Sequence, residues 1–420
     1  MVFMSFSTGM VYCWTLFRED IEQWGTVRYY VDGVFQGYHS YFTPAILTLA
    51  FQLALFVLGM TAAFGGVIVE RSVKKASLLT FIFFSSGWLL TAIGIWIRNP
   101  WLLVICFGPI QGIGLGLGYL TPIKTLMMWF NEKKGFAAGV AIAAFTLAGL
   151  LGNPLLGGLL SFDALGNYPH RAAFILTAIF AVLCFTAYRW IDRPELSAED
   201  AAARTYSAKE VIFSKKFIYL WIVLFINIAA GLAVMSHEQQ IYLMTGLNIV
   251  EHRMLIVVLA TLTGGLANMS GRLIMAGSQD RTDKKHLPYY VMAIASIAIC
   301  LIAAVGLLPL HFIPMFIAIF VIQFFFGCGF ACLPGILEQQ YGMKQLATIQ
   351  GYILTAWGIA ALVGPQIASS ILVLYDPTTG APAQTETLYT LYMVLGGMFV
   401  VQMIALLLFV QAAKKDKASA

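Results

Sequence analysis

Charged residues are scarce in this sequence. Asp, Glu, Lys and Arg make up 11% of its 420 residues, against about 25% in soluble globular domains. Hydrophobic residues make up 60% of the chain, and its mean hydropathy is +0.82. No soluble protein of one or two domains can bury this much apolar surface, so composition predicts a multi-pass membrane protein surrounded by a lipid bilayer. The formal net charge of +5 does not indicate nucleic-acid binding, because the basic residues lie in short loops between apolar runs.

Patterns that would support catalysis or cofactor binding are also missing from the sequence. It contains no His-Glu-x-x-His pattern and no Ser/His/Asp set at helical spacing, which argues against a membrane-embedded hydrolase. The glycine-rich run from Gly108 to Gly118 lies inside an apolar span without a preceding strand, so it is not a nucleotide-binding loop. The six cysteines all fall in apolar runs without a metal-ligand partner set. We therefore predict no enzyme activity, no cofactor, no metal and no nucleotide partner.

Long apolar runs dominate what is present, and twelve apolar segments can be counted as candidate transmembrane helices. In rough limits they are 1–17, 43–66, 76–97, 101–128, 136–162, 171–191, 217–236, 254–277, 287–308, 311–334, 347–375 and 387–412. The longest charged stretch between them is Asp192–Lys216. This stretch predicts a cytoplasmic linker over 192–216 that joins an N-terminal six-helix half, 1–191, to a C-terminal six-helix half, 217–420.

The first apolar run stops before Arg18 and is short for a membrane span. It has no basic flank and no small-residue cleavage site, so it is not a signal peptide. We expect either an upstream extension before Met1 or a first helix that begins in the headgroup region. The loop that follows, Arg18–Phe42, is rich in aromatic residues, and an interfacial helix over the entrance is one expectation for it.

The distribution of Lys and Arg predicts the orientation of the chain in the membrane. If both termini face the cytoplasm, the inner loops and tail hold eighteen of the 25 basic residues and the outer loops hold five. The remaining two, Lys124 and Arg272, lie inside apolar runs. The excess on one side favours cytoplasmic termini.

The two predicted halves repeat one another. Glu70-Arg71-x-x-Lys74-Lys75 follows the second apolar run, and Asp280-Arg281-x-x-Lys284-Lys285 follows the eighth, at an offset of 210 residues. Pro154 in the fifth run matches Pro365 in the eleventh at an offset of 211 residues. A repeat of this kind places a substrate site near mid-membrane between the halves.

These repeated loops, the duplicated halves and the glycine-proline end of the fifth run resemble the major facilitator superfamily across the whole chain. Finer motifs are similar to those of the oxalate/formate antiporter family, which is related to the monocarboxylate porters. They are Gly9-x-x-Tyr12-x-Trp14-Thr15-Leu16-Phe17, Tyr119 ten residues before Trp129-Phe130, Asn268-x-x-x-Arg272, and Pro334 ahead of Tyr341-Gly342. The resemblance implies an all-α membrane protein with twelve transmembrane helices in two pseudo-symmetric halves. It also implies secondary active transport of small organic anions by alternating access.

Arg272 is the leading candidate for the substrate-binding cation. It lies eight residues before Asp280, where the charges begin, and eight residues of helix span roughly 12 Å. A charge at the bilayer centre costs about 2.5–3.5 kcal/mol on insertion scales, so it is retained where it faces a partner or a cavity. We interpret Arg272 as a fixed cation for a carboxylate. The alternatives are an inward charge paired with a neighbouring helix and a side chain that snorkels to the cytoplasmic surface.

Asn268 lies one helical turn before Arg272 on the same face. Proton-coupled monocarboxylate porters resemble this stretch but carry an aspartate there. An asparagine does not titrate, which weakens proton symport through this pair and favours exchange or facilitated transport. The alternative is an amide that only packs between helices.

The eleventh apolar run departs from the oxalate/formate pattern, which places a lysine in an Ala-Lys-Gly sequence, because this chain has Ala356-Trp357-Gly358. Loss of one expected cation argues against a dicarboxylate such as oxalate, and a cation beside an indole suits a monocarboxylate. Trp357 could instead only pack against the eighth helix. Lys124 could restore a second charge if it turned inward, and snorkelling to the cytoplasmic surface is the alternative.

Further residues enter through the resemblance. Tyr12, Tyr119, Phe326, Phe330 and Trp357 occupy positions where the resembled family builds a cavity wall, although aromatic stripes are more often packing. The expected moving parts are Gly152, Pro154 and Pro365, which packing alone could also explain. The resemblance also implies that ion pairs at Glu70, Arg71, Asp280 and Arg281 latch the halves in the outward-open state, with topology charge as the alternative. His237 and Glu238 could titrate, but we expect them at an exposed outer rim.

The sequence thus predicts a transporter of the bacterial inner membrane, with both termini cytoplasmic and with a monomer as the expected form. Its predicted substrate is a small organic anion, a monocarboxylate rather than oxalate, moved by exchange or facilitated transport. The alternative is a proton-coupled symporter of the lactate/pyruvate type.

Overall fold

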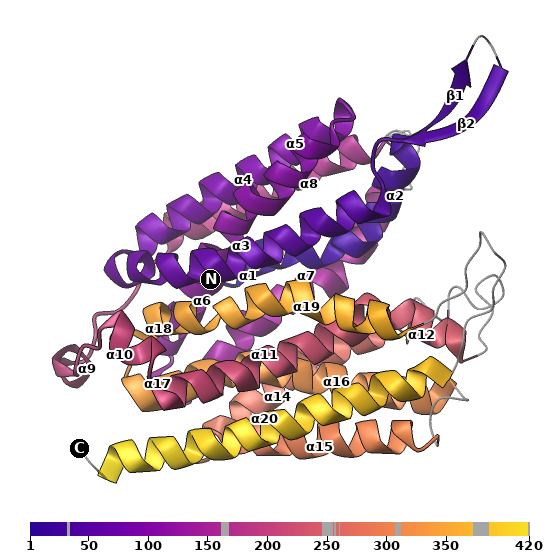
Figure 1. Ribbon diagram of the computed structural model, residues 1–420. Helices are drawn as coiled ribbons and strands as arrows, with labels where there is room; N and C mark the ends of the chain where they lie inside the picture. The colour runs from indigo at the N-terminus through magenta and orange to yellow at the C-terminus, as the bar shows by residue number, and fades with distance from the viewer. Residues whose placement is uncertain are drawn as a thin grey trace.

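The computed structural model describes residues 1–31, 34–160, 168–245, 255, 258–259, 261–306, 312–372 and 386–418. Its helices run roughly parallel to one another, as Figure 1 shows. At one end of the molecule lie the C-terminus and two short helices of the charged linker, α9 (Ala198–Ala202) and α10 (Ala208–Ile212). We call this the linker end. At the opposite end a two-stranded ribbon projects from the bundle, and we call this the hairpin end.

Each of the twelve predicted apolar runs carries helix in the described residues. The first group is α1 (Val2–Gly9), η1 (Met10–Cys13), α2 (Trp14–Gly25), α3 (Pro44–Arg71), α4 (Val73–Trp96), α5 (Pro100–Ile105), η2 (Cys106–Ile110), α6 (Gln111–Trp129), η3 (Asn131–Lys133), α7 (Lys134–Leu160) and α8 (Pro169–Trp190). The second group is α11 (Lys215–Ser236), α12 (Glu238–Met244), η5 (Thr261–Ala267), α14 (Asn268–Gln279), α15 (Leu287–Ala304), α16 (Phe312–Ala331), α17 (Leu333–Tyr341), α18 (Leu346–Ile353), α19 (Thr355–Ile371) and α20 (Glu386–Ala418). We refer to them as the N-terminal and C-terminal groups.

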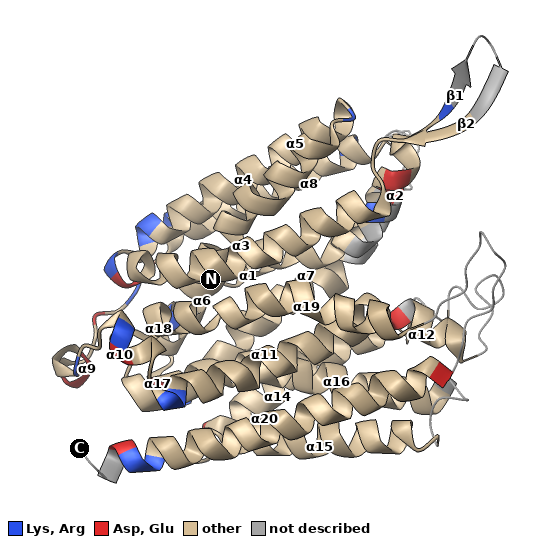
Figure 2. Ribbon diagram, in the orientation of Figure 1, with Lys and Arg blue, Asp and Glu red and all other residues tan. Residues whose placement is uncertain are grey.

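The positions of charge explain why these segments are helical. Most charged residues lie at the two ends of the bundle, and few are seen in its middle, as Figure 2 shows. A segment without water must satisfy its own backbone hydrogen bonds, and a helix does so within one segment. Among the described helices, ten are long and apolar enough to cross a membrane, and Val2–Cys13 is a shorter apolar helix.

Helix starts are marked by the residues expected to cap them. The Thr43 hydroxyl accepts a hydrogen bond from the Ile46 amide, and Pro44 follows at the first helical position of α3. Asn99 caps α5 in the same way before Pro100. These side chains satisfy amides that the first helical turn leaves without a partner.

The segment after the first apolar run differs from the prediction. Helix continues through α2 to Gly25 instead of ending before Arg18, and the loop then forms an antiparallel ribbon rather than an interfacial helix. Its strands are β1 (Thr26–Val31) and β2 (Val34–Ser40), and Thr26 pairs with Ser40. β-branched and aromatic residues, which fit strands well, are frequent in both. A membrane helix can continue beyond the apolar layer, so the first charged residue after an apolar run does not mark the end of the helix.

The N-terminal and C-terminal groups meet along closely packed helices. α7 packs against α14, and α3 packs against α18 and α19. At Gly66 on α3, a Cβ atom would lie 2.5 Å from the Ala347 oxygen of α18. At Gly351 on α18, it would lie 2.0 Å from the Ala62 oxygen of α3. Only glycine fits at these two positions, which allows the backbones of the two groups to touch.

Candidate functional site

Close helix packing places Arg272 between the two groups. Arg272 lies on α14, which packs against α7 on one side and α16 on the other. At Gly139 of α7, a Cβ atom would come within 2.8 Å of the Arg272 carbonyl oxygen. At Gly271 it would come within 1.9 Å of the Phe324 oxygen of α16. The glycines therefore allow α14 to lie directly against both neighbours, and Arg272 is 1% exposed.

The Arg272 guanidinium is held by hydrogen bonds from two directions. Its Nε donates to Asn268 Oδ1 over 2.8 Å on the same helix. Its Nη1 donates to the Ile142 carbonyl oxygen of α7, also over 2.8 Å. Its Cζ atom lies 5.3 Å from the centre of the Phe330 ring, which is a cation–π distance. Among the described residues, no carboxylate forms an ion pair with Arg272, so the buried charge is not neutralised.

An aromatic cluster closes the space beside Arg272. The Phe330 and Trp357 ring centres are 4.6 Å apart, and the Tyr119 and Trp357 ring centres are 5.2 Å apart. Phe145 of α7 stands edge-on to Tyr119 at 5.6 Å and to Tyr12 at 5.5 Å. All five rings are buried, so the cluster excludes water from the guanidinium.

Several polar atoms in this cluster lack an acceptor. Arg272 Nη2, Trp357 Nε1 and the Tyr119 hydroxyl are buried, and in the described part of the chain none has a hydrogen-bond partner. The Tyr119 and Tyr12 hydroxyls both lie within electrostatic reach of Arg272. A buried donor without an acceptor costs about 1–3 kcal/mol. An anion supplies acceptors to all of them, so the arrangement is suited to binding one.

The sequence-predicted residues divide into two sets. Arg272, Asn268, Trp357, Tyr119 and Tyr12 come together with Phe330 around one point. Phe326 lies one turn behind Phe330, and a Cβ atom at Gly231 of α11 would be 2.3 Å from its ring. Phe326 therefore supports the cluster from the C-terminal group.

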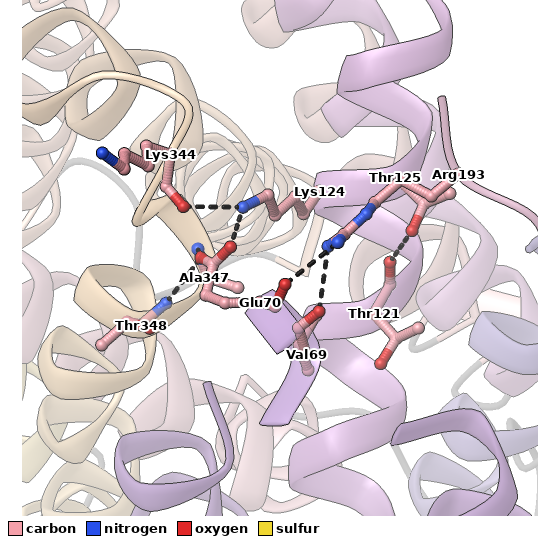
Figure 3. Close-up of polar contacts among 9 residues, drawn as sticks. All are labelled: Val69, Glu70, Thr121, Lys124, Thr125, Arg193, Lys344, Ala347 and Thr348. Atoms are coloured by element: carbon pink, nitrogen blue, oxygen red, sulfur yellow. Dashed lines mark hydrogen bonds and ion pairs between the residues drawn. The ribbon is translucent and has the colours of Figure 1, made fainter. Parts of the chain in front are cut away.

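Lys124 lies away from Arg272, at the linker end. It neither snorkels nor faces Arg272: it is 1% exposed and forms an ion pair with Glu70 at the linker end. Its Nζ also donates to the Lys344 carbonyl oxygen over 3.1 Å. Glu70 Oε1 in turn accepts hydrogen bonds from the amides of Ala347, at 2.7 Å, and Thr348, at 3.3 Å. Figure 3 shows Glu70 between the Lys124 ammonium and these amides at the start of α18.

The second acidic motif makes the corresponding contact. Asp280 Oδ1 accepts from the Gly135 amide over 2.7 Å, and Oδ2 accepts from the Phe136 amide over 2.8 Å, at the start of α7. Gly135 and Phe136 are offset by 212 residues from Ala347 and Thr348. Each carboxylate thus binds a helix N-terminus of the other group, where backbone amides favour an anion.

These contacts across the groups are continued by the Lys134–Glu338 ion pair at 2.8 Å. We call the Glu70–Lys124, Asp280 and Lys134–Glu338 contacts together the linker-end latch. Arg71 and Arg281 do not join it in the described residues, because both side chains are exposed and neither forms an ion pair there.

The remaining predicted moving parts lie within helices. Gly152 of α7 faces η1, and a Cβ atom there would be 2.4 Å from Met10 Sδ. Pro154 lies within α7, and Pro365 lies inside α19. Close packing accounts for Gly152, and a role of the two prolines in bending stays a prediction.

Comparison with known proteins identifies the family. The chain matches the Major Facilitator Superfamily over residues 24–365. The chain belongs to this superfamily. It is therefore a multi-pass membrane transporter with the all-α fold of the superfamily, and it is not an enzyme, as the sequence predicted.

Members of the superfamily resemble the chain over most of its length. It is 25% identical over 370 residues to "Uncharacterized MFS-type transporter YhjX" of Escherichia coli (strain K12), covering 86% of this chain and 84% of that one. It is 22% identical over 383 residues to "Oxalate:formate antiporter" of Oxalobacter formigenes, covering 88% and 82%. Among solved structures, the proton:xylose symporter XylE aligns with a TM-score of 0.67 at 14% identity, covering 97% and 94%. This last likeness concerns the fold.

Sequence reasoning missed two features of this superfamily member. Phe145 joins the cluster beside Arg272, but nothing distinguishes it from the many other apolar residues of its run. Glu238 was expected at an exposed rim and is instead 5% exposed. Its neighbour His237 is half-buried. The position of Glu238 at the end of an apolar run gave no sign that neighbouring helices cover it.

Proposed function

We propose that this transporter carries small organic anions with a single carboxylate by alternating access, and that Arg272 binds the carboxylate. The observation that carries the proposal is the buried Arg272 guanidinium, which has no described carboxylate partner and one N–H without an acceptor. A carboxylate would accept from Arg272 Nη2 and from the nearby Trp357 and Tyr119 donors. Charge-assisted hydrogen bonds of this kind are roughly twice as strong as neutral ones.

Two further observations support a carboxylate of small size. The relative from Oxalobacter formigenes is named for exchange of oxalate and formate, and it aligns with 88% of this chain. The aromatic rings around Arg272 leave an apolar wall where a second carboxylate would need another cation. Lys124 does not supply it, because its charge is engaged by Glu70. We therefore favour a monocarboxylate over oxalate.

Asn268 favours exchange or facilitated transport, because its side-chain amide does not gain or lose a proton near neutral pH. Proton-coupled symport is the second candidate. The specific observation in its favour is the buried carboxyl of Glu238.

We also propose that the linker-end latch is the cytoplasmic gate. It joins the start of α18 to Glu70 and the start of α7 to Asp280, so it closes this end while it is intact. We infer that the linker end lies in the cytoplasm of a bacterial cell, so that both termini are cytoplasmic and the structure is closed on its cytoplasmic side. A single chain contains both groups, which supports function as a monomer.

Counterflow in liposomes tests the proposed function. Vesicles containing the purified protein and loaded with unlabelled pyruvate should transiently accumulate labelled pyruvate from outside, because an alternating-access carrier exchanges the two pools. Protein-free vesicles are the control. Accumulation of labelled xylose, but of no labelled pyruvate, formate or lactate, would contradict a carboxylate carrier.

Substitution of Trp357 tests the selectivity argument. Trp357→Lys places a second cation beside Arg272, so we expect oxalate to compete with labelled pyruvate at least about tenfold better than in the wild type, which is about 1.4 kcal/mol. Trp357→Phe keeps an aromatic ring and should keep the wild-type preference. If the lysine variant folds and its preference is unchanged, Trp357 only packs.

A further inference from the structure

Glu238 lies at the hairpin end of the C-terminal group, two residues beyond the spanning helix α11. It is the first residue of α12, against which α16 packs. Although it lies outside the span, its side chain is 5% exposed. A buried carboxylate normally needs a cation, yet in the described part of the chain Glu238 forms no ion pair. The site therefore favours the neutral carboxylic acid.

The contacts of Glu238 point to a proton on its carboxyl group. Glu238 Oε1 is in hydrogen-bond contact with the Thr263 hydroxyl of η5. The same hydroxyl lies 2.9 Å from the carbonyl oxygen of Leu259, four residues earlier in the sequence. A threonine hydroxyl has one hydrogen, and an ionised carboxylate only accepts. The single hydroxyl hydrogen of Thr263 cannot serve the Glu238 and Leu259 oxygens fully at the same time, and a proton on the Glu238 carboxyl, donated to the Thr263 oxygen, would make both contacts full hydrogen bonds.

Within the part of the chain that the structure describes, few titratable groups face Glu238. Tyr242 lies one turn along α12, and its hydroxyl interacts with Glu238. Tyr392 of α20 is also within electrostatic reach. The adjacent His237 is turned to Ser236, at 2.8 Å, and to Ser369, at 3.1 Å. The sequence of α16 contains no Asp, Glu, His, Lys or Arg.

Burial is the largest influence on the Glu238 carboxyl, and hydrogen bonds with Thr263 and Tyr242 act against it. It raises the pKa of the Glu238 carboxyl from its ordinary value of 4.5 to about 8. Because the folded-state pKa is raised, the protonated carboxyl stabilises this conformation fully below pH 4.5. That stabilisation is lost as the pH rises through about 8.

Glu238 is connected to the Arg272 site through one continuous helix. Thr263 lies in the π-helical segment η5, which runs directly into α14 with Asn268 and Arg272. Nine residues of helix separate Thr263 from Arg272, or roughly 13 Å. At Gly265, in the same segment, a Cβ atom would be 3.2 Å from the Leu150 side chain of α7. Single π-helical segments are often found at functional sites. A change at Glu238 thus acts on the helix that carries Arg272 and touches the other group.

We propose that Glu238 is the proton-binding site of this transporter and that one proton moves with each anion. The proton binds Glu238 from the outer solution when the linker end is closed, and symport requires that reorientation then open a path from Glu238 to the cytoplasm. Arg272 binds the anion and Glu238 binds the proton, so the non-titrating Asn268 no longer argues against symport. This inference rests on the proposed function, because it needs an anion to travel with the proton.

Transport assays on the Glu238→Gln variant distinguish net uptake, which needs the proton, from exchange, which does not. In the wild type, the initial rate of labelled pyruvate uptake into proteoliposomes should fall by about tenfold between external pH 7 and pH 9, because one pH unit above the pKa leaves about a tenth of the group protonated. The neutral amide of Glu238→Gln should abolish this pH dependence and the response to an imposed proton gradient. Counterflow needs no net proton movement and should stay within about twofold of the wild type. Glu386→Gln is the matched control, because Glu386 is an exposed glutamate at the same end and should behave as the wild type.

Loss of counterflow in Glu238→Gln, or an unchanged pH dependence, would overturn the proton site. Failure of the wild-type protein to move pyruvate, formate or lactate would instead overturn the proposed function. Infrared spectroscopy of the purified protein tests the proton site without any substrate. The C=O stretch of a protonated carboxyl should disappear from the wild type and from Glu386→Gln between pH 7 and pH 9, and it should be missing from Glu238→Gln throughout. The same band in Glu238→Gln would show that another group titrates.

Discussion

Arg272→Gln should abolish measurable uptake of small carboxylates while the protein still folds. Glutamine keeps a polar side chain near Asn268 but removes the one charge that the described residues place in the cluster of Tyr119, Phe330 and Trp357. Removing one partner of a buried, hydrogen-bonded charge pair costs about 2–5 kcal/mol, which corresponds to roughly 30-fold to several thousand-fold in affinity. We expect a loss in this range, measured as the initial rate of labelled pyruvate uptake by proteoliposomes.

Binding can be measured separately from transport. A ligand that binds only the folded state raises its stability by about 2.7 kcal/mol at a hundredfold excess over Kd. Thermal unfolding of the wild type should therefore shift upward with pyruvate, and the shift should vanish in Arg272→Gln. Arg272→Lys keeps the charge but not the planar fork, so it should recover part of the shift.

An exposed arginine provides the control that distinguishes loss of the binding site from a general effect of removing a positive charge. Arg189, in the last turn of α8, is exposed, and Arg189→Gln should transport as the wild type does. An Arg272→Gln protein that unfolds normally and still takes up pyruvate at wild-type rates would remove Arg272 from the site. Unfolding of Arg272→Gln without ligand is the control for the lost hydrogen bond to the Ile142 oxygen.

The sequence was sufficient to find Arg272 because its signal is local. A charge inside an apolar run is visible without knowledge of any neighbour, and so is an asparagine one turn away. The twelve apolar runs were found for the same reason, since the requirement for apolar residues acts on each segment separately. The sequence placed the end of the first helix too early, because the part of a helix that continues beyond the apolar layer cannot be recognised by its hydropathy.

The residues that were misinterpreted depend on partners far along the chain. Lys124 contacts Glu70, 54 residues away in the sequence, and Lys344, 220 residues away. The residues around Lys124 in the sequence do not indicate either contact. Glu238 is adjacent to polar residues in sequence but is covered by η5 and α16 in space. Burial is a property of tertiary packing, so a charged residue at the end of an apolar run looks exposed until the neighbouring helices are placed.

A second large effect is expected when the linker-end latch is broken at Glu70. Glu70→Gln should leave the Lys124 ammonium buried without its carboxylate. Breaking a buried ion pair by removing one partner costs about 3–5 kcal/mol. The cost falls only on conformations in which the linker end is closed, because opening this end returns Lys124 to water. We therefore expect the equilibrium to shift towards the linker-end-open conformation.

Hydrogen exchange reports this opening directly. The amides of Ala347 and Thr348 donate to Glu70 in the closed latch, so their exchange rates follow its opening equilibrium. In Glu70→Gln they should exchange at least about 100-fold faster than in the wild type, given the loss of 3–5 kcal/mol. The amides of Gly135 and Phe136, held by Asp280, should accelerate with them if the two halves of the latch open together.

Paired variants separate the latch from ordinary surface charge. Glu70→Gln combined with Lys124→Met removes both charges, and it should exchange more slowly than Glu70→Gln alone because no unpaired buried charge remains. Lys134→Met breaks a half-exposed pair, so its effect should stay within about 1 kcal/mol, or about fivefold in exchange. Lys209→Met, on the exposed helix α10, should exchange as the wild type does. Equal protection of Ala347 and Thr348 in Glu70→Gln and in the wild type would show that packing of α3 on α18, not the carboxylate, holds the linker end closed.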